Sequence, residues 1–328
     1  MSPAPIAVTA WGIHVPDVSL DAAIGVATGD PACPPERAQE LLGLKGLLNK
    51  DAATRLALCA IHRALGLPPR APRASGPPDP RVAIVASSNL GNVSTVQAVV
   101  RTLRTGSLKD VSALDAPNAS SNVIATTAAI WFRFGGPNLM VCSGATSGLD
   151  AVSLGCTLLR ARRADRVIVV GSEPGDAAAH QLFARRAATQ RGDRLCAGAA
   201  AVVLERADDA AATDAPVLGA IHHSMTVSRD DGDSAALTIG PALGESNDED
   251  RNAGRTIDLT RIIGDAYGAL GVLQIAVAAA LMTQSPRPSS IAVRCGDELD
   301  GWRTTIVRDG AALSVSVPAP AALAREAI

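Results

Sequence analysis

Short apolar runs alternate with segments of helical periodicity along most of this chain. The runs are rich in Val, Ile, Leu and Ala, and runs this short and apolar are typical of strands buried on both faces. The predicted strands are residues 6–9, 82–86, 139–141, 166–170, 201–204, 217–221, 291–293 and 312–317. The predicted helices are residues 51–65, 94–103, 120–132, 145–162 and 265–282. This alternation predicts an α/β protein with mixed or mostly parallel sheets.

Three segments interrupt the pattern. Residues 67–80, LPPRAPRASGPPDP, predict a surface loop, because proline is excluded from helix interiors and central strands. The acidic residues 244–250 predict a second exposed loop. Residues 206–215 form a low-order segment between two predicted strands, and we place a boundary there. The expected halves are residues 1–205 and 216–328.

Composition narrows the class of partner. A chain of 328 residues can bury a large core, either as one domain or as two halves that share an interface. Its net charge of -2 gives no reason to expect nucleic acid or an anionic membrane as a partner. The longest apolar helical run, residues 273–282, is too short to span a bilayer, and the first residues lack a signal-peptide pattern. We therefore expect a cytoplasmic protein.

Cofactor signals are absent from the sequence. The six cysteines lie without CxxC or zinc-type spacing, so we expect reduced thiols and no metal site. No GxGxxG motif follows a predicted strand, so we expect no nucleotide cofactor either.

Residues 135–155, GGPNLMVCSGATSGLDAVSLG, carry the most informative local pattern. A predicted strand leads into a turn of small residues, Cys142-Ser143-Gly144, and a helix begins near Ala145. Such a turn holds a reactive side chain at the positive end of a helix, where a thiolate is stabilised. The residue at its tip is Ala145, whose methyl group can do no covalent chemistry.

Residues 115–174 resemble the β-ketoacyl synthases of fatty acid and polyketide assembly. The shared positions, in the family's order and spacing, are Pro117-Asn118, Gly136-Pro137, Thr146-Ser147-Gly148 and Val169-Val170-Gly171-Ser172. Residues 6–16, 196–205 and 264–274 resemble the family's first strand, the strand that closes its first half, and its Gly-His-x-x-Gly-Ala-x-Gly turn. The resemblance implies a thiolase-like fold, with two similar α/β halves in an αβαβα layered arrangement, and obligate dimerisation.

The departures from the family concern its catalytic side chains. Ala145 stands at the position of the Cys nucleophile, and Asp265 at a catalytic His position. Thr260 or Arg261 falls near the expected Lys, and no His follows His223. The family's Gly-Phe-Gly-Gly loop has no recognisable counterpart in residues 295–302. With all of these features lost together, the chain resembles the chain length factor branch of type II polyketide synthases. Better-known members of that branch carry Gln at the position of Ala145 and are longer.

The resemblance implies a non-catalytic subunit. It would form a heterodimer with an active ketosynthase, and shape the cavity in which a chain bound to an acyl carrier protein grows. The strand that pairs across the dimer axis in relatives corresponds to Leu139, Met140 and Val141. The other residues implied for the cavity or interface are Leu90, Ala116, Pro117, Asn118, Val123, Thr126 and Thr127.

Two alternatives remain open at this point. The chain could be a stand-alone acyltransferase or hydrolase that uses Cys142, Ser143 or Thr146, with a base among His180, His222 and His223. It could also be a homodimeric scaffold without a substrate. On the non-catalytic hypothesis, Cys142 is a buried thiol at a strand end, and the Asp265 carboxylate caps the helix that starts there.

Overall fold

The computed structural model describes residues 5–27, 29–187, 194–226, 235–241 and 255–310. Ten strands of this part form one sheet in the order β3-β2-β4-β5-β1-β6-β10-β9-β7-β8. The strands are β1 (Ile6–His14), β2 (Val82–Ser87), β3 (Asn138–Val141), β4 (Arg166–Glu173), β5 (Gly198–Arg206), β6 (Gly219–Thr226), β7 (Leu237–Ile239), β8 (Arg255–Ile257), β9 (Ser290–Asp297) and β10 (Gly301–Arg308).

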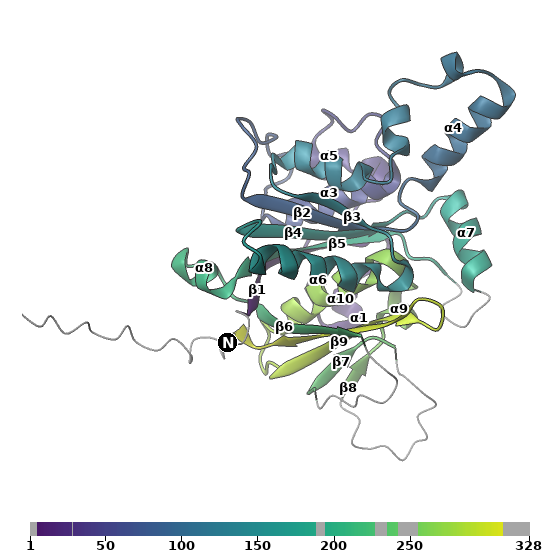
Figure 1. Cartoon of the computed structure of the whole chain (residues 1–328). Helices are drawn as coiled ribbons and strands as arrows, with labels where there is room; N and C mark the ends of the chain where they lie inside the picture. Colours follow the sequence, from purple (N-terminus) through teal and green to yellow (C-terminus); the bar gives the residue numbers. More distant parts are fainter. Residues whose placement is uncertain (1–4, 28, 188–193, 227–234, 242–254, 311–328) are drawn as a thin grey trace, which may run out of the picture.

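Helices cover this sheet in layers. The α-helices are α1 (Leu20–Ile24), α2 (Gln39–Leu42), α3 (Ala52–Ala64), α4 (Val93–Thr105), α5 (Val123–Phe132), α6 (Ser147–Arg160), α7 (Ala177–Ala187), α8 (Ala207–Ala212), α9 (Leu259–Ile263) and α10 (Leu270–Leu281). Figure 1 shows α3 and α5 on one face of the strands β1 to β5. Helices α6 and α10 lie between those strands and the strands β6 to β10. The α/β class and the stacking of helices and strands in layers are therefore as predicted, and the described residues supply every layer of the expected αβαβα arrangement except the helices outside the second set of strands.

The connectivity of the first five strands is repeated in the last five. In the first set, β2 is parallel to β3 and β4, while β5 is antiparallel to β4 and β1. In the second set, β7 is parallel to β8 and β9, while β10 is antiparallel to β9 and β6. A short antiparallel pairing of β1 with β6 joins the two sets. The boundary proposed from the sequence falls between β5 and β6.

The two central helices, α6 and α10, pack against each other between the sets. Every residue of α10 is buried, which matches a helix that is apolar on all sides. Gly148 of α6 faces Gly271 of α10, and a Cβ at Gly148 would lie 2.6 Å from the backbone N of Gly271. The two helices can approach this closely because neither residue has a side chain.

The second set of strands presents a polar face away from α10. Leu237, Ile239 and Ile257 are buried in the core around α10, whereas the alternate residues Thr238 and Thr256 are not. Among the described residues, no helix covers the outer side of β7, β8 and β9 (Figure 1). Alternation of apolar and polar residues is typical of a sheet with one solvated face.

Most predicted elements with strong periodicity are present within a few residues of their expected ends. The predicted strand 312–317 and the acidic loop 244–250 lie outside the described residues. The segment 206–215 was wrong as a low-order stretch, because residues 207–212 form α8. Runs of alanine favour a helix, and Asp208 and Asp209 stabilise its positive first turn. No helix in the described ranges is long and apolar enough to cross a membrane.

Candidate functional site

The strand–turn–helix segment predicted around Ala145 is present. Strand β3 leads through Gly144 into a short 3-10 turn, Gly144–Thr146, from which α6 continues. Gly144 has a φ of 73°, a left-handed conformation that favours glycine. Ala145 is 8% exposed, and its backbone N–H belongs to the first turn of this helical segment. We call this strand–turn–helix segment the nucleophile platform, after the role that the resemblance implies for it; the side chain at its tip is the methyl group of Ala145.

A carboxylate occupies the helical end of this platform. The backbone N–H of Ala145 donates to Oδ2 of Asp300, at an N···O distance of 2.7 Å. Asp300 lies in the turn between β9 and β10, and a Cβ at Gly144 would overlap its carboxylate. A negative group at the start of a helix is stabilised by the backbone N–H groups that lack partners there. The amide that would otherwise face a substrate is therefore already bound.

Two further side chains fix this carboxylate. Arg186 of α7 pairs with Asp300 and also with Asp297, at 2.6 Å from the Asp297 carboxylate. Asp297 accepts the N–H groups of Leu299 and Asp300. Burial of Asp297 opposes its ionisation, but hydrogen bonds from Asp300 and Arg186 outweigh it and lower its pKa. We call Arg186, Asp297 and Asp300 the acidic plug.

Asn89 holds the platform from the other side. Its side-chain amide donates to the carbonyl O of Gly144 at 2.8 Å and accepts the Gly144 N–H at 3.0 Å. The Ser147 hydroxyl also donates to the Asn89 amide oxygen, at 3.1 Å. Because these contacts satisfy both backbone groups of Gly144, the turn has one well-defined conformation.

Glu173, at the end of β4, is a fully buried carboxylate beside the platform. It accepts the N–H groups of Asn89, Leu90 and Gly268 and the Ser88 hydroxyl. Burial raises its pKa to about 7, and these hydrogen bonds oppose the rise. Glu173 therefore joins three segments of the site: the residues after β2, the end of β4 and the turn before α10.

The buried Glu173 predicts a pH dependence of stability. Its carboxyl loses a proton near pH 4.5 in the unfolded chain and near pH 7 in the folded chain. Stability from this group is thus present below pH 4.5 and lost as the pH rises through 7. Relative to wild type, Glu173→Gln should gain up to about 3 kcal/mol of unfolding free energy between about pH 5 and about pH 8. Urea unfolding at several pH values measures this slope, and a flat difference would contradict the raised pKa.

The hydroxyls near the turn are bound to a carboxylate. Ser143 Oγ and Thr146 Oγ1 donate to Asp150 at 2.6 and 2.7 Å, and Arg303 pairs with Asp150 at 2.8 Å. Burial opposes ionisation of Asp150, but hydrogen bonds from Ser143, Thr146 and Arg303 lower its pKa. An ion-paired carboxylate with a lowered pKa is a weak base for activating a hydroxyl.

The histidines proposed for the alternative chemistry lie elsewhere. His180 is exposed on α7, and His222 and His223 belong to β6, where their side chains lie outside the described residues. In the described part of the chain, neither the Ser143 nor the Thr146 hydroxyl contacts a histidine.

The expectation that Cys142 is buried was wrong. Cys142 is exposed, because β3 is the outermost strand at its end of the sheet and no further strand covers it. Partial burial of its sulfur and the negative charge of Glu173 nevertheless raise the pKa of this thiol. A thiol with a raised pKa is mostly protonated near neutral pH and is a poor nucleophile.

Asp265 was predicted to cap a helix that starts there, but α10 starts at Leu270 and Asp265 is not its N-cap residue. Its carboxylate accepts the N–H of Tyr267 at 2.7 Å, at the start of the turn Tyr267–Ala269 that leads into α10. Thr260 and Arg261, the two candidates for the family's lysine position, both contact Asp258. The Thr260 hydroxyl donates to the Asp258 carboxylate, and the exposed Arg261 forms an ion pair with it.

The residues implied for the cavity or interface are divided among three environments. Leu90 packs in one small cluster with Ala145, Phe183 and Tyr267. Val123 and Thr127 are buried, with Val123 in the core around α3, and Asn118 is buried with its amide bound to Asn49 and Leu114. Residues at the surface are Ala116, Pro117 and Thr126, while Leu139, Met140 and Val141 are half-buried. The structure thus brings Leu90, but not the others, against Ala145.

The sequence analysis missed the acidic plug and Glu173. Residues 296–301, GDELDG, carry a hairpin signal in their two glycines, which could have placed the turn. The contact of this turn with Ala145 depends on tertiary packing between residues 155 positions apart.

Comparison with known proteins agrees with this fold. The family model for the β-ketoacyl synthase N-terminal domain matches residues 43–210, and the chain belongs to this family. No curated protein matches the chain.

Two solved structures have the same fold over nearly the whole chain. One is described as the ishigamide ketosynthase/chain length factor, with a TM-score of 0.67 and 22% identity, covering 93% of this chain and 99% of that chain. The other is the AntDE:AntF complex, a type II PKS acyl-carrier protein in complex with its ketosynthase bound to the hexaketide. It has a TM-score of 0.70 and 14% identity, with coverages of 93% and 99%.

Proposed function

We propose that this chain is the chain length factor of a type II polyketide synthase. In this role it is a non-catalytic subunit that pairs with an active ketosynthase and shapes the cavity for a chain bound to an acyl carrier protein. The observation that carries the proposal is the state of the nucleophile platform. Ala145 has no reactive group, and its backbone N–H is bound by Asp300.

The acidic plug argues against acyl transfer on this subunit. Acyl transfer needs a nucleophile and hydrogen-bond donors aimed at the oxygen that becomes negative. A substrate oxygen at the Ala145 N–H would have to displace a carboxylate that is also paired with Arg186. The described geometry supports a subunit that contributes shape and rigidity instead of covalent chemistry.

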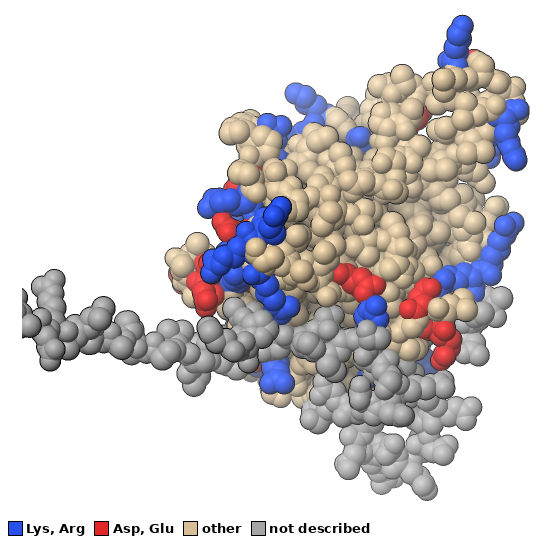
Figure 2. All heavy atoms as spheres, viewed as in Figure 1, with Lys and Arg blue, Asp and Glu red and all other residues tan. Residues whose placement is uncertain are grey.

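Exposed apolar side chains on α4, α5, α7 and the loop after α4 support pairing with another protein. Helix α4 buries none of its residues, and α5 exposes Ile130 at 59%. Figure 2 shows few charged side chains over α5 and β3 on this face. Large exposed apolar side chains near these elements are Val100, Leu103, Leu108, Leu114, Ile130 and Leu182. Contiguous exposed apolar surface on a folded protein marks an interaction site. Both similar solved structures are described as containing a ketosynthase, the partner class proposed here.

Thr126 provides a test of the cavity role. Thr126 is exposed on α5, beside Asn122, in the part of the surface assigned to the partner. In the complex co-expressed with its ketosynthase, Thr126→Trp should shorten the product by at least one extender unit, because a larger side chain reduces the space for the growing chain. Mass spectrometry of the products measures the change. Thr213→Trp, at an exposed position after α8, is the control, and unchanged products from a folded Thr126→Trp complex would count against the cavity role.

Intact-mass spectrometry tests the absence of covalent chemistry. The purified chain is incubated with an acyl pantetheine thioester, alone and with a ketosynthase. The ketosynthase used is one that co-purifies with this chain on co-expression. We expect the acyl adduct on that ketosynthase and none on this chain. An adduct mapped to Cys142, Ser143 or Thr146 of the isolated chain would overturn the proposal in favour of a stand-alone acyltransferase. Failure of co-expressed ketosynthases to co-purify with this chain would favour the homodimeric scaffold.

A further inference from the structure

Three potential metal ligands meet away from the nucleophile platform. His14 is the last residue of β1, Cys33 lies in the loop before α2, and Cys59 lies in α3. Their ligand atoms all lie within 4.8 Å of one another. His14 and Cys59 are fully buried, while Cys33 is partly exposed. The three side chains therefore form one compact cluster, which can be reached from the Cys33 side.

One nitrogen of the His14 ring lies close to Cys33, and the other lacks a hydrogen-bond partner in the described part of the chain. Nε2 of His14 lies 3.8 Å from Sγ of Cys33 and 2.9 Å from the carbonyl O of Cys33. Nδ1 of His14 is buried without a hydrogen-bond partner in the described part of the chain.

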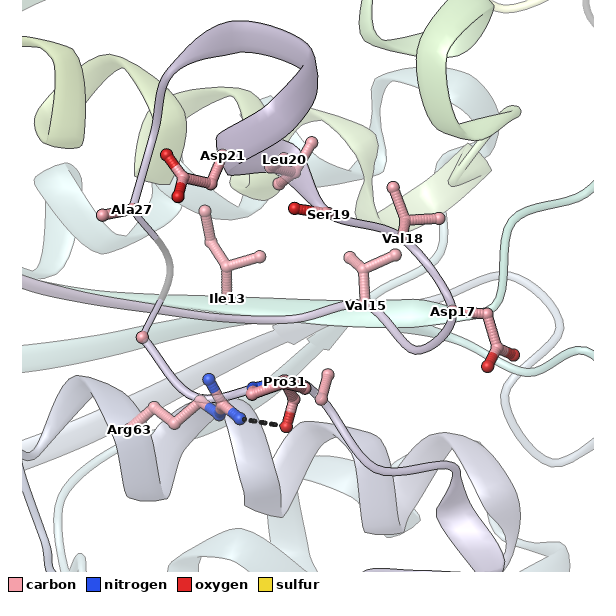
Figure 3. A pocket seen from close by; sticks show the side chains of 12 residues that line it. Ile13, Val15, Asp17, Val18, Ser19, Leu20, Asp21, Ala27, Pro31 and Arg63 are labelled. Carbon is pink, nitrogen blue, oxygen red and sulfur yellow. Dashed lines mark hydrogen bonds between the residues drawn. The ribbon is translucent and has the colours of Figure 1, made fainter.

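The frame around the cluster is well anchored. His14 belongs to a strand paired with β5, and Cys59 lies in a helix packed on that strand. The loop that carries Cys33 is held by Arg63 of α3, whose guanidinium donates to the carbonyl O of Pro31 at 3.2 Å (Figure 3). Two ligands thus lie on rigid elements and the third lies on a tethered loop. A pocket of about 500 Å³ is lined by residues that include His14, Cys33 and Glu40.

We propose that His14, Cys33 and Cys59 bind a Zn²⁺ ion whose fourth position opens to this pocket. Two thiolates and an imidazole are ligands that Zn²⁺ prefers. Tetrahedral zinc places thiolate sulfurs about 3.8 Å apart and sulfur and nitrogen ligands about 3.5 Å apart, as follows from its bond lengths. The distance of 3.8 Å between Nε2 of His14 and Sγ of Cys33 is close to the value for sulfur and nitrogen ligands. On binding, both thiols release their protons to solvent, and the charges of ion and thiolates cancel.

This site differs from the sequence-based expectation of no metal. That expectation relied on ligand spacing within short motifs, whereas these ligands come from three separate elements that tertiary folding brings together. The proposal is independent of the function proposed above, because none of the three residues contacts the acidic plug or Ala145 in the described structure.

Cobalt titration of the full-length, reduced chain tests the site. Co²⁺ replaces Zn²⁺ in such sites and gives thiolate-to-metal charge-transfer absorption, which apo protein lacks. We expect this absorption to saturate at one Co²⁺ per chain and to disappear when Zn²⁺ is added. Cys33→Ser and Cys59→Ala should each weaken binding at least 100-fold. The control is Cys142→Ser, which removes an exposed thiol outside the cluster and should bind like wild type.

Three results would overturn the proposal. The first is the lack of charge-transfer absorption in wild type with excess Co²⁺. The second is absorption that survives in Cys33→Ser and is lost in Cys142→Ser, which would place the ion on the exposed thiol. The third is a peptide cross-linked between Cys33 and Cys59 in chain purified without oxygen, which would identify the pair as a disulfide instead. Thermal unfolding of Cys33→Ser verifies that this variant is folded.

Discussion

A Gly148→Ala variant should lose about 2–3 kcal/mol of unfolding free energy, although alanine is the better helix former. Helix propensity alone predicts a gain of about 1 kcal/mol. The new methyl group, however, would lie 2.6 Å from the backbone N and 2.8 Å from the Cα of Gly271. Backbone atoms in a buried helix pair cannot move aside as a side chain can, so overpacking costs at the upper end of about 1–3 kcal/mol or more. The sign of the change in unfolding free energy thus shows whether overpacking or helix propensity dominates.

Gly155, about two turns further along α6, is the matched control. It is buried in the same helix, but a Cβ there would meet the methyl groups of Val169 at 3.0 Å and Val167 at 3.3 Å. Because side chains can adjust, Gly155→Ala should change stability by less than about 1 kcal/mol. Urea unfolding of both variants measures the difference. Equal losses, or a gain at Gly148, would show that the contact between α6 and α10 is looser than described.

A Met140→Pro variant should still fold but should lose at least 100-fold in affinity for its ketosynthase. Strand β3 is parallel to β2, where Ile84 N–H donates to Pro137 and Ser88 N–H donates to Val141. Backbone groups alternate in direction along a strand, so those of Met140 point away from β2 towards the free edge. Proline at position 140 therefore leaves the hydrogen bonds to β2 intact. It removes the backbone N–H that a strand of the ketosynthase would need as a donor at this edge. Gel filtration and titration calorimetry with the ketosynthase measure the loss.

Two further variants keep the interface prediction decisive. Met140→Ile retains the backbone N–H and should retain the complex. Ile130→Glu places a charge on an α5 side chain that is 59% exposed, so it should leave the isolated fold intact and prevent association. Wild-type affinity in both Met140→Pro and Ile130→Glu would place the partner on another surface.

The sequence predicted the elements whose pattern is local. Residues 51–65 combine helical periodicity with Asp51, whose side chain accepts the Thr54 N–H at the helix start, and α3 forms there. Strands β7 and β8 have three residues each and were missed, because so short a run carries no periodic signal. Strand β10 was missed because Arg303 interrupts its apolar pattern, and this charge is paired with Asp150 of α6.

The candidate site could likewise be predicted from the sequence only where its residues are contiguous. Ala145 and its turn are contiguous in sequence, so a turn with a methyl group at its tip could be predicted without a structure. The acidic plug joins α7 to the turn after β9, and Arg186 and Asp300 are 114 positions apart. The three residues proposed to bind zinc likewise come from separate elements. Contacts of this kind are set by tertiary packing, which no local pattern encodes.

The position of Asp300 also bears on the evolutionary history of this subunit. A cysteine introduced at residue 145 would stand beside a carboxylate already bonded to the backbone N–H of its own residue. Repulsion from that charge would disfavour the thiolate, so the variant would gain a sulfur without gaining a reactive one. If the chain has the non-catalytic role proposed above, selection would therefore have nothing to favour in a cysteine at residue 145 alone.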